Sequence, residues 1–291
     1  MDSVIAIDLG GTKLTAAVVD ENGTISSQRK VAAVRGDVRA SAAQIAELIS
    51  GLQARAAGLI IPGISSERTG TAWAPNLWGH DHVPLRDELE RVLPLPVIID
   101  SDRAGYVMGE AWLGAARGLS DVVFLAVGTG IGAGIISGGR LLRGAGDIAG
   151  AVGWFALDPA WRDDYAQTGC WEAESGGPAL ARGAGMKNAE EVVAAARAGD
   201  PRACDAVDRA VTFMAMGIAN LISVLNPQMI VLGGGLMQAS GLFLERIRQR
   251  TARWAQPVAA TQVRIEVSQL GENAGLLGAA KLALDGIYVR S

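Results

Sequence analysis

The sequence of 291 residues is poor in cysteine, histidine and aromatic residues, and it has no long basic or apolar run. Its two cysteines, Cys170 and Cys204, imply no disulfide framework, and a reducing cytoplasm is the default compartment for such a chain. The formal net charge is −4 and no Lys/Arg cluster resembles a basic arm, so we expect no nucleic-acid partner. Apolar runs are too short or too interrupted to span a bilayer, and the first residues do not resemble a signal peptide. We therefore expect a cytoplasmic protein without a membrane partner.

Two classes of residue are plentiful. Hydrophobic residues make up 49% of the chain, which is enough to bury a large core, and there are 38 glycines. The glycines show no collagen-like period, so they indicate tight turns and close approaches of the backbone.

The first part of the chain predicts an α/β pattern. β-branched apolar runs predict strands, while an alanine-rich amphipathic segment and a charged segment predict helices. The expected strands are residues 4–8, 14–19, 24–30, 59–61 and 97–99; the expected helices are 39–57, 84–92 and a segment after Asp102 that contains Glu110. Residues 65–82 are expected to be irregular.

The second part continues the pattern. Asp200-Pro201 is a strong helix start, with an N-cap followed by proline at the first helical position. The expected strands are 121–127, 133–136, 229–232 and 263–267; the expected helices are 201–225, 242–254 and 274–284, with one or two more after residue 176. Residues 143–176 are expected to be mostly irregular, as an insertion near a site.

One plan occurs twice in the sequence. Residues 5–19 and 124–136 each read as an apolar strand, a glycine turn bearing threonine, and a second strand. This repetition suggests a duplicated fold, although two glycine-rich hairpins can also resemble each other by chance.

The glycine turns suit phosphate binding. Glycine lets backbone N–H groups approach phosphate oxygens without a Cβ in the way, and Thr12, Thr129 and Lys13 add a hydroxyl or a cation. Asp8, at the end of the first strand, is placed to hold Mg²⁺. No Walker motif occurs, and residues 128–134 run into a hairpin rather than a helix, which argues against an NAD fingerprint.

Asp100 and Asp102 follow an apolar strand and precede a helix. Carboxylates at the carboxyl end of a buried strand lie where open α/β folds bind ligands. The alternative is that one of them simply caps the helix, and this stretch alone favours the cap.

Seven motifs, in order along almost the whole chain, resemble the ROK family of bacterial sugar kinases and related repressors. They are Asp8-Leu-Gly-Gly-Thr-Lys13, Ile61-Pro-Gly63, Pro75-Asn-Leu77, Val127-Gly-Thr-Gly-Ile-Gly-Ala-Gly134, Gly169-Cys-Trp-Glu172, Ile230-Val-Leu-Gly-Gly-Gly235 and Gly275-Leu-Leu-Gly-Ala-Ala280. The resemblance implies the actin-like ATPase (ribonuclease H-like) fold, with two duplicated α/β domains around a cleft. We assign the domains to 1–115 and 116–291, with the last helix able to pack back on the first domain. ATP, Mg²⁺ and a homodimer are also implied.

The resemblance also assigns roles to residues. The phosphate loops are Asp8, Gly10, Gly11, Thr12 and Lys13, and Gly128, Thr129, Gly130 and Gly132; the adenosine side is Gly233, Gly234 and Gly235 with Asn273. Counting back from Gly109-Glu110-Ala111 makes Asp102, not Asp100, the general base that takes the hydroxyl proton during phosphoryl transfer. The substrate side is Gly63, Asn76, Ser101, Asp102, Trp154 and Glu172.

The sugar end departs from the family pattern. Where the family reads Asn-Asp-Ala-Asn, the amides are replaced by Ser101 and Ala104, and where it reads Gly-Glu-x-Gly-His, the Glu and His are Ala151 and Trp154. Trp154 either stacks on an apolar sugar face, which we favour slightly, or fills volume. Because these polar groups discriminate hydroxyls, plain glucose bound in the usual way is not the expected substrate.

The structural zinc motif of the family, Cys-x-Cys-Gly-x-x-Gly-Cys, retains only Cys170, in Asp163-Asp-Tyr-Ala-Gln-Thr-Gly-Cys170. One thiol cannot make a tetrahedral site, so we expect no zinc. His80 and His82 are expected to be surface loop residues.

Three functional classes follow from the resemblance. An ATP-dependent carbohydrate kinase is favoured by the retained phosphate loops and Asp102. A protein that senses a sugar or nucleotide with little or no transfer is the alternative, favoured by the altered sugar end. A DNA-binding repressor needs an N-terminal helix-turn-helix, for which the early first strand leaves no room.

Overall fold

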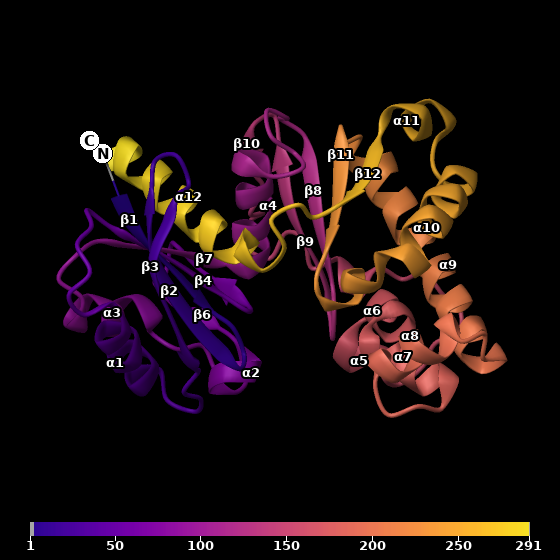
Figure 1. Ribbon diagram of the computed structural model, residues 1–291, viewed down its shortest axis with the longest axis horizontal. Helices are drawn as coiled ribbons and strands as arrows, with labels where there is room; N and C mark the ends of the chain where they lie inside the picture. Colours follow the sequence, from indigo (N-terminus) through magenta and orange to yellow (C-terminus); the bar gives the residue numbers. More distant parts are fainter. Residues whose placement is uncertain (1–2, 291) are drawn as a thin grey trace. The chain divides into compact units, whose positions relative to one another are not determined.

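The computed structural model describes residues 3–290, with the side chains of residues 3–287, and the chain divides into two compact units. The first unit consists of the chain up to Gly118, residues 141–149 and the chain from Gln269 onward. The second consists of residues 119–140 and 150–268. Each unit is an α/β body with its own sheet (Figure 1).

The sheet of the first unit mixes antiparallel and parallel pairs. Its strands, in spatial order, are β3 (Ile25–Ala32), β2 (Lys13–Asp20), β1 (Ser3–Leu9), β4 (Ala57–Ile61) and β7 (Val97–Ser101). β1 pairs with β2 antiparallel, and β1, β4 and β7 are parallel. The carboxyl ends of these three parallel strands therefore share one edge of the sheet. A separate small sheet joins β5 (Ile64–Ser65) and β6 (Ala72–Trp73).

Helices cover this sheet. They are α1 (Val38–Ile49), α2 (Pro75–Trp78), α3 (Leu85–Val92), α4 (Asp102–Leu113), η3 (Gly271–Asn273) and α12 (Ala274–Arg290). α12, yellow in Figure 1, packs with α4, β1 and β4 although it is the last element of the chain. A Cβ at Gly278 of α12 would lie 1.8 Å from the Gly105 carbonyl oxygen of α4. The two helices thus cross in backbone contact, which only glycine permits.

The sheet of the second unit has the same plan. Its strands, in spatial order, are β10 (Arg140–Leu141), β9 (Ile131–Ser137), β8 (Val122–Val127), β11 (Met229–Gly233) and β12 (Arg264–Val267). β8 pairs with β9 antiparallel, and with β11 in parallel. The equivalent strand orders show that the strand–turn–strand repeat of the sequence marks two copies of one architecture.

The second unit is rich in helices. They are η1 (Val152–Trp154), α5 (Tyr165–Thr168), α6 (Cys170–Ser175), α7 (Gly177–Ala184), α8 (Ala189–Arg197), α9 (Pro201–Leu225), η2 (Gly235–Ala239), α10 (Ser240–Trp254) and α11 (Pro257–Gln262). As the sequence predicts, Asp200 caps α9 by accepting a hydrogen bond from the Ala203 amide at 2.9 Å. Asn226 ends it in a left-handed conformation, with φ of 44°.

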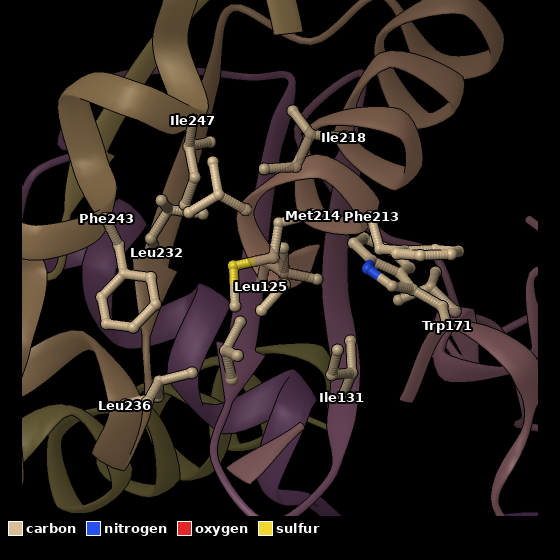
Figure 2. Packing of buried hydrophobic residues seen from close by; sticks show 14 of the residues in the cluster. Leu125, Ile131, Trp171, Phe213, Met214, Ile218, Leu232, Leu236, Phe243 and Ile247 are labelled. Atoms are coloured by element: carbon tan, nitrogen blue, oxygen red, sulfur yellow. The ribbon is translucent and has the colours of Figure 1, made fainter. Parts of the chain in front are cut away.

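A large apolar core lies between this sheet and its helices. Figure 2 shows side chains from β8, β11, α9 and α10 within it, among them Leu125, Leu232, Met214 and Phe243. Trp171 of α6 is wholly buried, and a Cβ at Gly217 of α9 would lie 2.4 Å from its ring. Gly217 therefore makes room for the indole, which stacks on Phe155 at a centroid distance of 5.7 Å.

α9 is long and apolar enough to cross a membrane by length and composition, alone among the helices of the described part of the chain. However, 61% of its most apolar window is buried in the protein. This is the position of a core helix, which explains its composition without a membrane.

Two expectations about elements are wrong. The helix expected over 39–57 ends at Ile49, because Gly51 adopts φ of 77° and β4 begins at Ala57. Residues 65–82, expected to be irregular, contain β6 and α2. Residues 143–176 are mostly irregular as expected, and within them lie the short helices η1, α5 and α6. These elements are two to six residues long, so they are too short to leave a period in the sequence.

Candidate functional site

The first glycine turn joins β1 to β2. The Gly10 amide donates a hydrogen bond to the Lys13 carbonyl at 2.8 Å, which closes a tight hairpin. Thr12 and Lys13 are exposed at its tip, so their hydroxyl and ammonium groups are available to a ligand. Asn76 of α2 lies beside this turn, because a Cβ at Gly11 would come within 3.6 Å of its Cβ. The predicted phosphate turn and a predicted sugar contact are therefore neighbours.

Asp8 is the penultimate residue of β1 and lies opposite Thr15 of β2 and Ile60 of β4. A Cβ at Gly275, in the first turn of α12, would lie 2.3 Å from the Asp8 Oδ2 atom. The missing side chain at Gly275 therefore creates the space that the carboxylate occupies.

Ser101, the last residue of β7, caps α4. Its Oγ accepts a hydrogen bond from the Ala104 amide at 3.2 Å. The expectation that Asp100 or Asp102 is the cap is therefore wrong. The serine hydroxyl fits the cap geometry, while Asp102 is the first residue of the helix and its Oδ1 accepts from the Arg103 amide at 2.8 Å.

Asp100 has a different role from Asp102. It is buried, and its Oδ2 accepts hydrogen bonds from the Arg143 guanidinium at 3.1 and 2.8 Å. Its Oδ1 accepts from the Ser101 amide at 2.7 Å. Burial raises the pKa of Asp100 and the Arg143 charge counteracts this, so Asp100 is an ion-paired structural neighbour.

Asp102 is close enough to Asp8 to influence its ionisation. Burial raises the pKa of Asp102 to about 6, against the opposing charge of Arg103. Burial and the charge of Asp102 raise the pKa of Asp8 to about 7, against the opposing charge of Lys30. Burial and the same two carboxylates raise the pKa of Tyr106, one turn further along α4. Two carboxyl groups thus lie in a region where ionisation is disfavoured, as is common at catalytic sites.

Arg103 and Tyr106 are residues that the sequence analysis missed. The Arg103 guanidinium lies 3.4 Å from the carbonyl oxygen of Gly63, after β4, so the structure brings Gly63 and Asp102 together through this arginine. The family segment Asn-Asp-Ala-Asn has alanine at the position of Arg103, and this departure could have identified it.

The second glycine turn, between β8 and β9, is tied to α6. The Gly128 carbonyl accepts a hydrogen bond from the Gly177 amide at 2.8 Å. Glu172 Oε2 accepts from the Ile131 amide at 2.8 Å, and a Cβ at Gly130 would lie 2.8 Å from the same oxygen. Burial raises the pKa of Glu172 against this amide bond. Glu172, predicted as a sugar contact, is therefore anchored to the predicted phosphate turn.

The third glycine turn follows β11, parallel to β8. Gly233 leaves room for the Phe124 ring, which a Cβ would approach to 2.2 Å, and Gly234 adopts φ of 90°. Gly235 opens η2, and its amide nitrogen would lie 3.7 Å from a Cβ on Gly128. The turns at residues 128–130 and 233–235 are therefore adjacent at one edge of the sheet.

A pocket of about 630 Å³ lies at this edge, inside the second unit. Three predicted residues, Gly128, Thr129 and Gly235, contribute to it. The other lining residues are Gly177, Pro178, Ala181, Lys187, Asn188, Ala189, Glu190, Val193, Ala194, Arg197, Leu236, Gln238 and Ala239. Most come from α7, α8 and η2, which the sequence analysis did not assign to a site. Asn273, predicted beside the adenosine, belongs to the first unit, at the end of η3.

Trp154 closes η1 and is 57% exposed. The ring is therefore accessible and does not fill a core. Stacking of Trp154 on an acceptor stays a prediction. Gly153, before it, packs closely on the Glu172 side chain, which a Cβ would approach to 3.2 Å.

Comparison with known proteins agrees with this architecture. A glucokinase of Streptomyces coelicolor is 33% identical over 97% of this chain and 98% of its own. An N-acetylmannosamine kinase of Escherichia fergusonii is 33% identical over the same shares of the two chains. The solved ROK family glucokinase from Streptomyces griseus, in complex with glucose and AMPPNP, superposes with a TM-score of 0.82 at 33% identity, covering 98% of this chain and all of the other.

Two sheets of equivalent strand order, each opening with a strand–glycine turn–strand, define the actin-like ATPase fold. Within that class, the chain belongs to the ROK family, which matches residues 4–286. The curated relatives are sugar kinases, and their full-length similarity supports a kinase of carbohydrate metabolism for this chain.

Proposed function

We propose that the protein is an ATP-dependent carbohydrate kinase that transfers the γ-phosphoryl group to a hydroxyl of a sugar or sugar derivative, with Asp102 as general base. The observation that carries this proposal is the environment of Asp102. Its carboxylate stands at the start of α4, beside Asp8 and Arg103, and its pKa is raised to about 6. A base with a pKa near the working pH is both ionised and an effective proton acceptor.

The reaction follows from these positions. The Asp102 carboxylate accepts the proton of the acceptor hydroxyl while that oxygen bonds to the γ-phosphorus. The bond from the γ-phosphorus to the bridging oxygen breaks, and ADP leaves with the electron pair. A positioned base contributes about 10²- to 10⁴-fold to such a step.

The nucleotide has a suitable site in the second unit. Small apolar side chains of α7, α8 and η2 form one wall of the pocket, and the turn bearing Thr129 forms another. Apolar lining residues suit a purine base, and glycine-turn amides suit phosphates. The solved relative that binds AMPPNP supports a nucleoside triphosphate as donor.

Mg²⁺ fits the donor chemistry at Asp8, with the ATP phosphates as the other ligands. The Asp8 carboxylate is a hard oxygen donor, and the space left by Gly275 keeps it free of a covering side chain on that side. Bound Mg²⁺ neutralises phosphate charge. Burial and the charge of Asp102 both disfavour ionisation of Asp8. A bound cation would favour the carboxylate and so lower the pKa of Asp8.

The residues proposed for acceptor binding are Gly63, Asn76 and Ser101 in the first unit and, separately, Trp154 and Glu172 in the second. Ser101 Oγ uses its lone pairs to cap α4, so its proton can still be donated to a sugar hydroxyl. The exposed Trp154 indole offers a stacking face, as at sites for sugars and their derivatives.

A coupled assay for ADP release tests the proposal, with hexoses, amino sugars, anhydrosugars and polyols as acceptors and the Asp102→Asn variant as control. Turnover that depends on the acceptor and is lost in the variant supports the kinase. Thermal shift with Mg-ATP separately tests nucleotide binding by the pocket.

A sugar- or nucleotide-sensing protein is the second candidate, and the residues Ala151 and Trp154 at the sugar end favour it. Acceptor binding measured by calorimetry, without turnover above Asp102→Asn, would replace the kinase proposal by this one.

A further inference from the structure

The segment from Leu157 to Ser175 is where the ROK resemblance implies a structural zinc, and its residues do not fit that metal. Cys170 is buried and its Sγ accepts a hydrogen bond from the Leu157 amide at 3.4 Å. Asp164 is engaged by Arg162, and Tyr165 donates to Glu174. Within the described residues, no group of three His, Cys, Asp or Glu side chains converges as metal ligands. A tetrahedral zinc site needs four such donors.

A cluster of charged residues occupies this region instead, with Glu174 at its centre. Glu174 is 4% exposed. Its Oε1 accepts hydrogen bonds from the Tyr165 hydroxyl, at 2.6 Å, and from Arg162. Its Oε2 accepts from Arg209 of α9 at 2.8 Å. Both carboxylate oxygens therefore accept hydrogen bonds, from the loop before α5, from α5 and from α9.

The rest of the cluster extends this bonding. Arg162 also binds Asp164, and its guanidinium lies 4.9 Å from the centre of the Tyr165 ring. Arg182 of α7 donates to the Ala173 carbonyl of α6 at 2.5 Å. The cluster thus joins the loop before α5 to α6, α7 and α9.

Glu174 and Glu172 lie on the same short helix, α6. The six-residue helix has few hydrogen bonds of its own, so its orientation depends on what holds it. On one side of α6, Glu172 accepts a hydrogen bond from the Ile131 amide. On the other side, Glu174 is held by Arg162 and Arg209. A displacement at Glu174 is therefore transmitted to Glu172 through two residues of helical backbone.

We propose that Glu174 is a positioning residue, and that its cluster with Arg162, Tyr165 and Arg209 takes the place of a zinc ion in fixing α6 and the acceptor-binding Glu172. The role of Glu172 toward an acceptor rests on the proposed function. The anchoring of Glu172 to Ile131 does not rest on it, and can be measured separately.

Charge explains why the cluster depends on Glu174. Removing the buried carboxylate leaves the guanidinium groups of Arg162 and Arg209 with only the more exposed Asp164 and Asp158 as counterions, which costs more than losing a surface pair. A metal-held loop loses its structure to chelators, whereas an ion-paired loop is insensitive to them. Sensitivity to a chelator therefore distinguishes a metal-held scaffold from an ion-paired one.

The first test is metal dependence. The purified protein is expected to contain substoichiometric zinc by elemental analysis, and excess 1,10-phenanthroline should leave its Tm unchanged. Stoichiometric zinc, or a fall in Tm with the chelator, would overturn the proposal.

The second test follows the Ile131 amide by hydrogen exchange. Glu174→Gln is expected to speed exchange at Ile131 about tenfold, since one buried charged hydrogen-bond site is lost. The Ala133 amide, bonded to the Gly150 carbonyl at 2.8 Å, is an internal reference that should not change. Asp208→Asn is the matched control, because Asp208 of α9 is also held by two arginines, Arg246 and Arg250 of α10. Equal exchange at Ile131 in both variants and the wild type would refute a positioning role.

The third test uses kinetics. Glu174→Gln should raise the acceptor KM about tenfold with a smaller change in kcat, and this effect should disappear in a Glu172→Gln background, because coupled residues are not additive. Additive effects would mean that Glu174 acts only on stability. If Glu174→Gln does not fold, Tyr165→Phe removes one hydrogen bond and keeps the ring, and it should raise the KM about threefold. If no acceptor is turned over, the proposed function fails, while zinc content and Ile131 exchange still decide the role of Glu174.

Discussion

Two pairs of carboxylates, Glu174 and Asp208 in the second unit and Asp8 and Asp102 in the first, are held in opposite ways. In the second unit, arginines bind the buried Glu174 and the half-exposed Asp208, and hydrogen bonds from Arg250 hold the pKa of Asp208 below its usual value. In the first unit, no arginine side chain makes a hydrogen bond to Asp8 or Asp102 within the described residues, and the pKa of each is raised. Carboxylates of the first kind build structure, while those of the second kind remain available to protons and cations. The presence or absence of an arginine partner therefore distinguishes structural carboxylates from candidate reactive ones without reference to sequence motifs.

The largest effect is expected at Asp102. Asp102→Asn keeps the shape and removes the base, so kcat should fall by about 10³-fold while Tm stays the same or rises. Asp208→Asn should do the reverse, lowering Tm and leaving kcat within about twofold, since an exposed carboxylate contributes only to stability. Steady-state kinetics and thermal denaturation of both variants test this. A kcat for Asp102→Asn close to that of the wild type would end the distinction.

Asp8→Asn should reduce activity by about 100-fold, because the ligand proposed for phosphate-bound Mg²⁺ is lost, and yet stabilise the fold. The pKa of Asp8 is about 7 in the folded protein, well above its usual value of 3.8, so the folded state holds a proton that the unfolded state releases between these pH values. The free energy of unfolding therefore falls as pH rises from about 4 to about 7. Asn at position 8 has no proton to lose, so this fall does not occur in the variant. Thermal scans should show a Tm about 3 °C higher than the wild type near pH 8, and a smaller gain near pH 5. A lower Tm at pH 8 would contradict the origin assigned to this pKa.

Gly278→Ala should destabilise the first unit by about 1–3 kcal/mol, because the new Cβ meets the Gly105 carbonyl where α12 crosses α4. Gly241→Ala, in α10 of the second unit, is the matched control, since nothing lies within 4 Å of its Cβ position. That variant should be neutral or more stable by about 0.5 kcal/mol. Chemical denaturation measures both. A neutral Gly278→Ala would mean that the two helices can separate at little cost.

The smallest effect is expected at Arg103. Its charge lowers the pKa of Asp102, so Arg103→Ala should shift the acidic limb of the kcat/KM profile upward from about 6. The shift should be about half a unit, because the arginine is partly exposed and screened. Activity should thus fall near pH 5.5 and be unchanged near pH 8, and 1 M salt should imitate the substitution in the wild type. A downward shift would show that Arg103 does not act on Asp102 by its charge.

The sequence predicts the parts of this fold that have a strong period or a clear boundary. Strands of β-branched residues and the start and end of α9 are confirmed, because their signals are local. The glycines at 275 and 278 show the limit of such signals. The helix predicted over 274–284 is confirmed, but the sequence does not predict that these two glycines admit the Asp8 carboxylate and the α4 backbone.

The candidate site depends more on tertiary structure. The local sequence cannot distinguish Asp100 from Asp102, since both follow a strand. What distinguishes them is Arg143, which reaches Asp100 from 43 residues away. The lining of the pocket in the second unit is missed because alanine and valine carry no chemical signature in sequence. Arg162, Glu174 and Arg209 are missed because their pairing is visible only when α6 and α9 are packed.

The position of α12 in the chain has a consequence for synthesis. The second unit is complete once residue 268 has left the ribosome, whereas the first unit still lacks α12, the helix that covers Asp8 and crosses α4. Domains generally fold as units during synthesis, and long-range contacts form late. The carboxylates of the first unit therefore acquire their buried environment last, and a nascent chain or a fragment ending before α12 has a folded second unit but no assembled base.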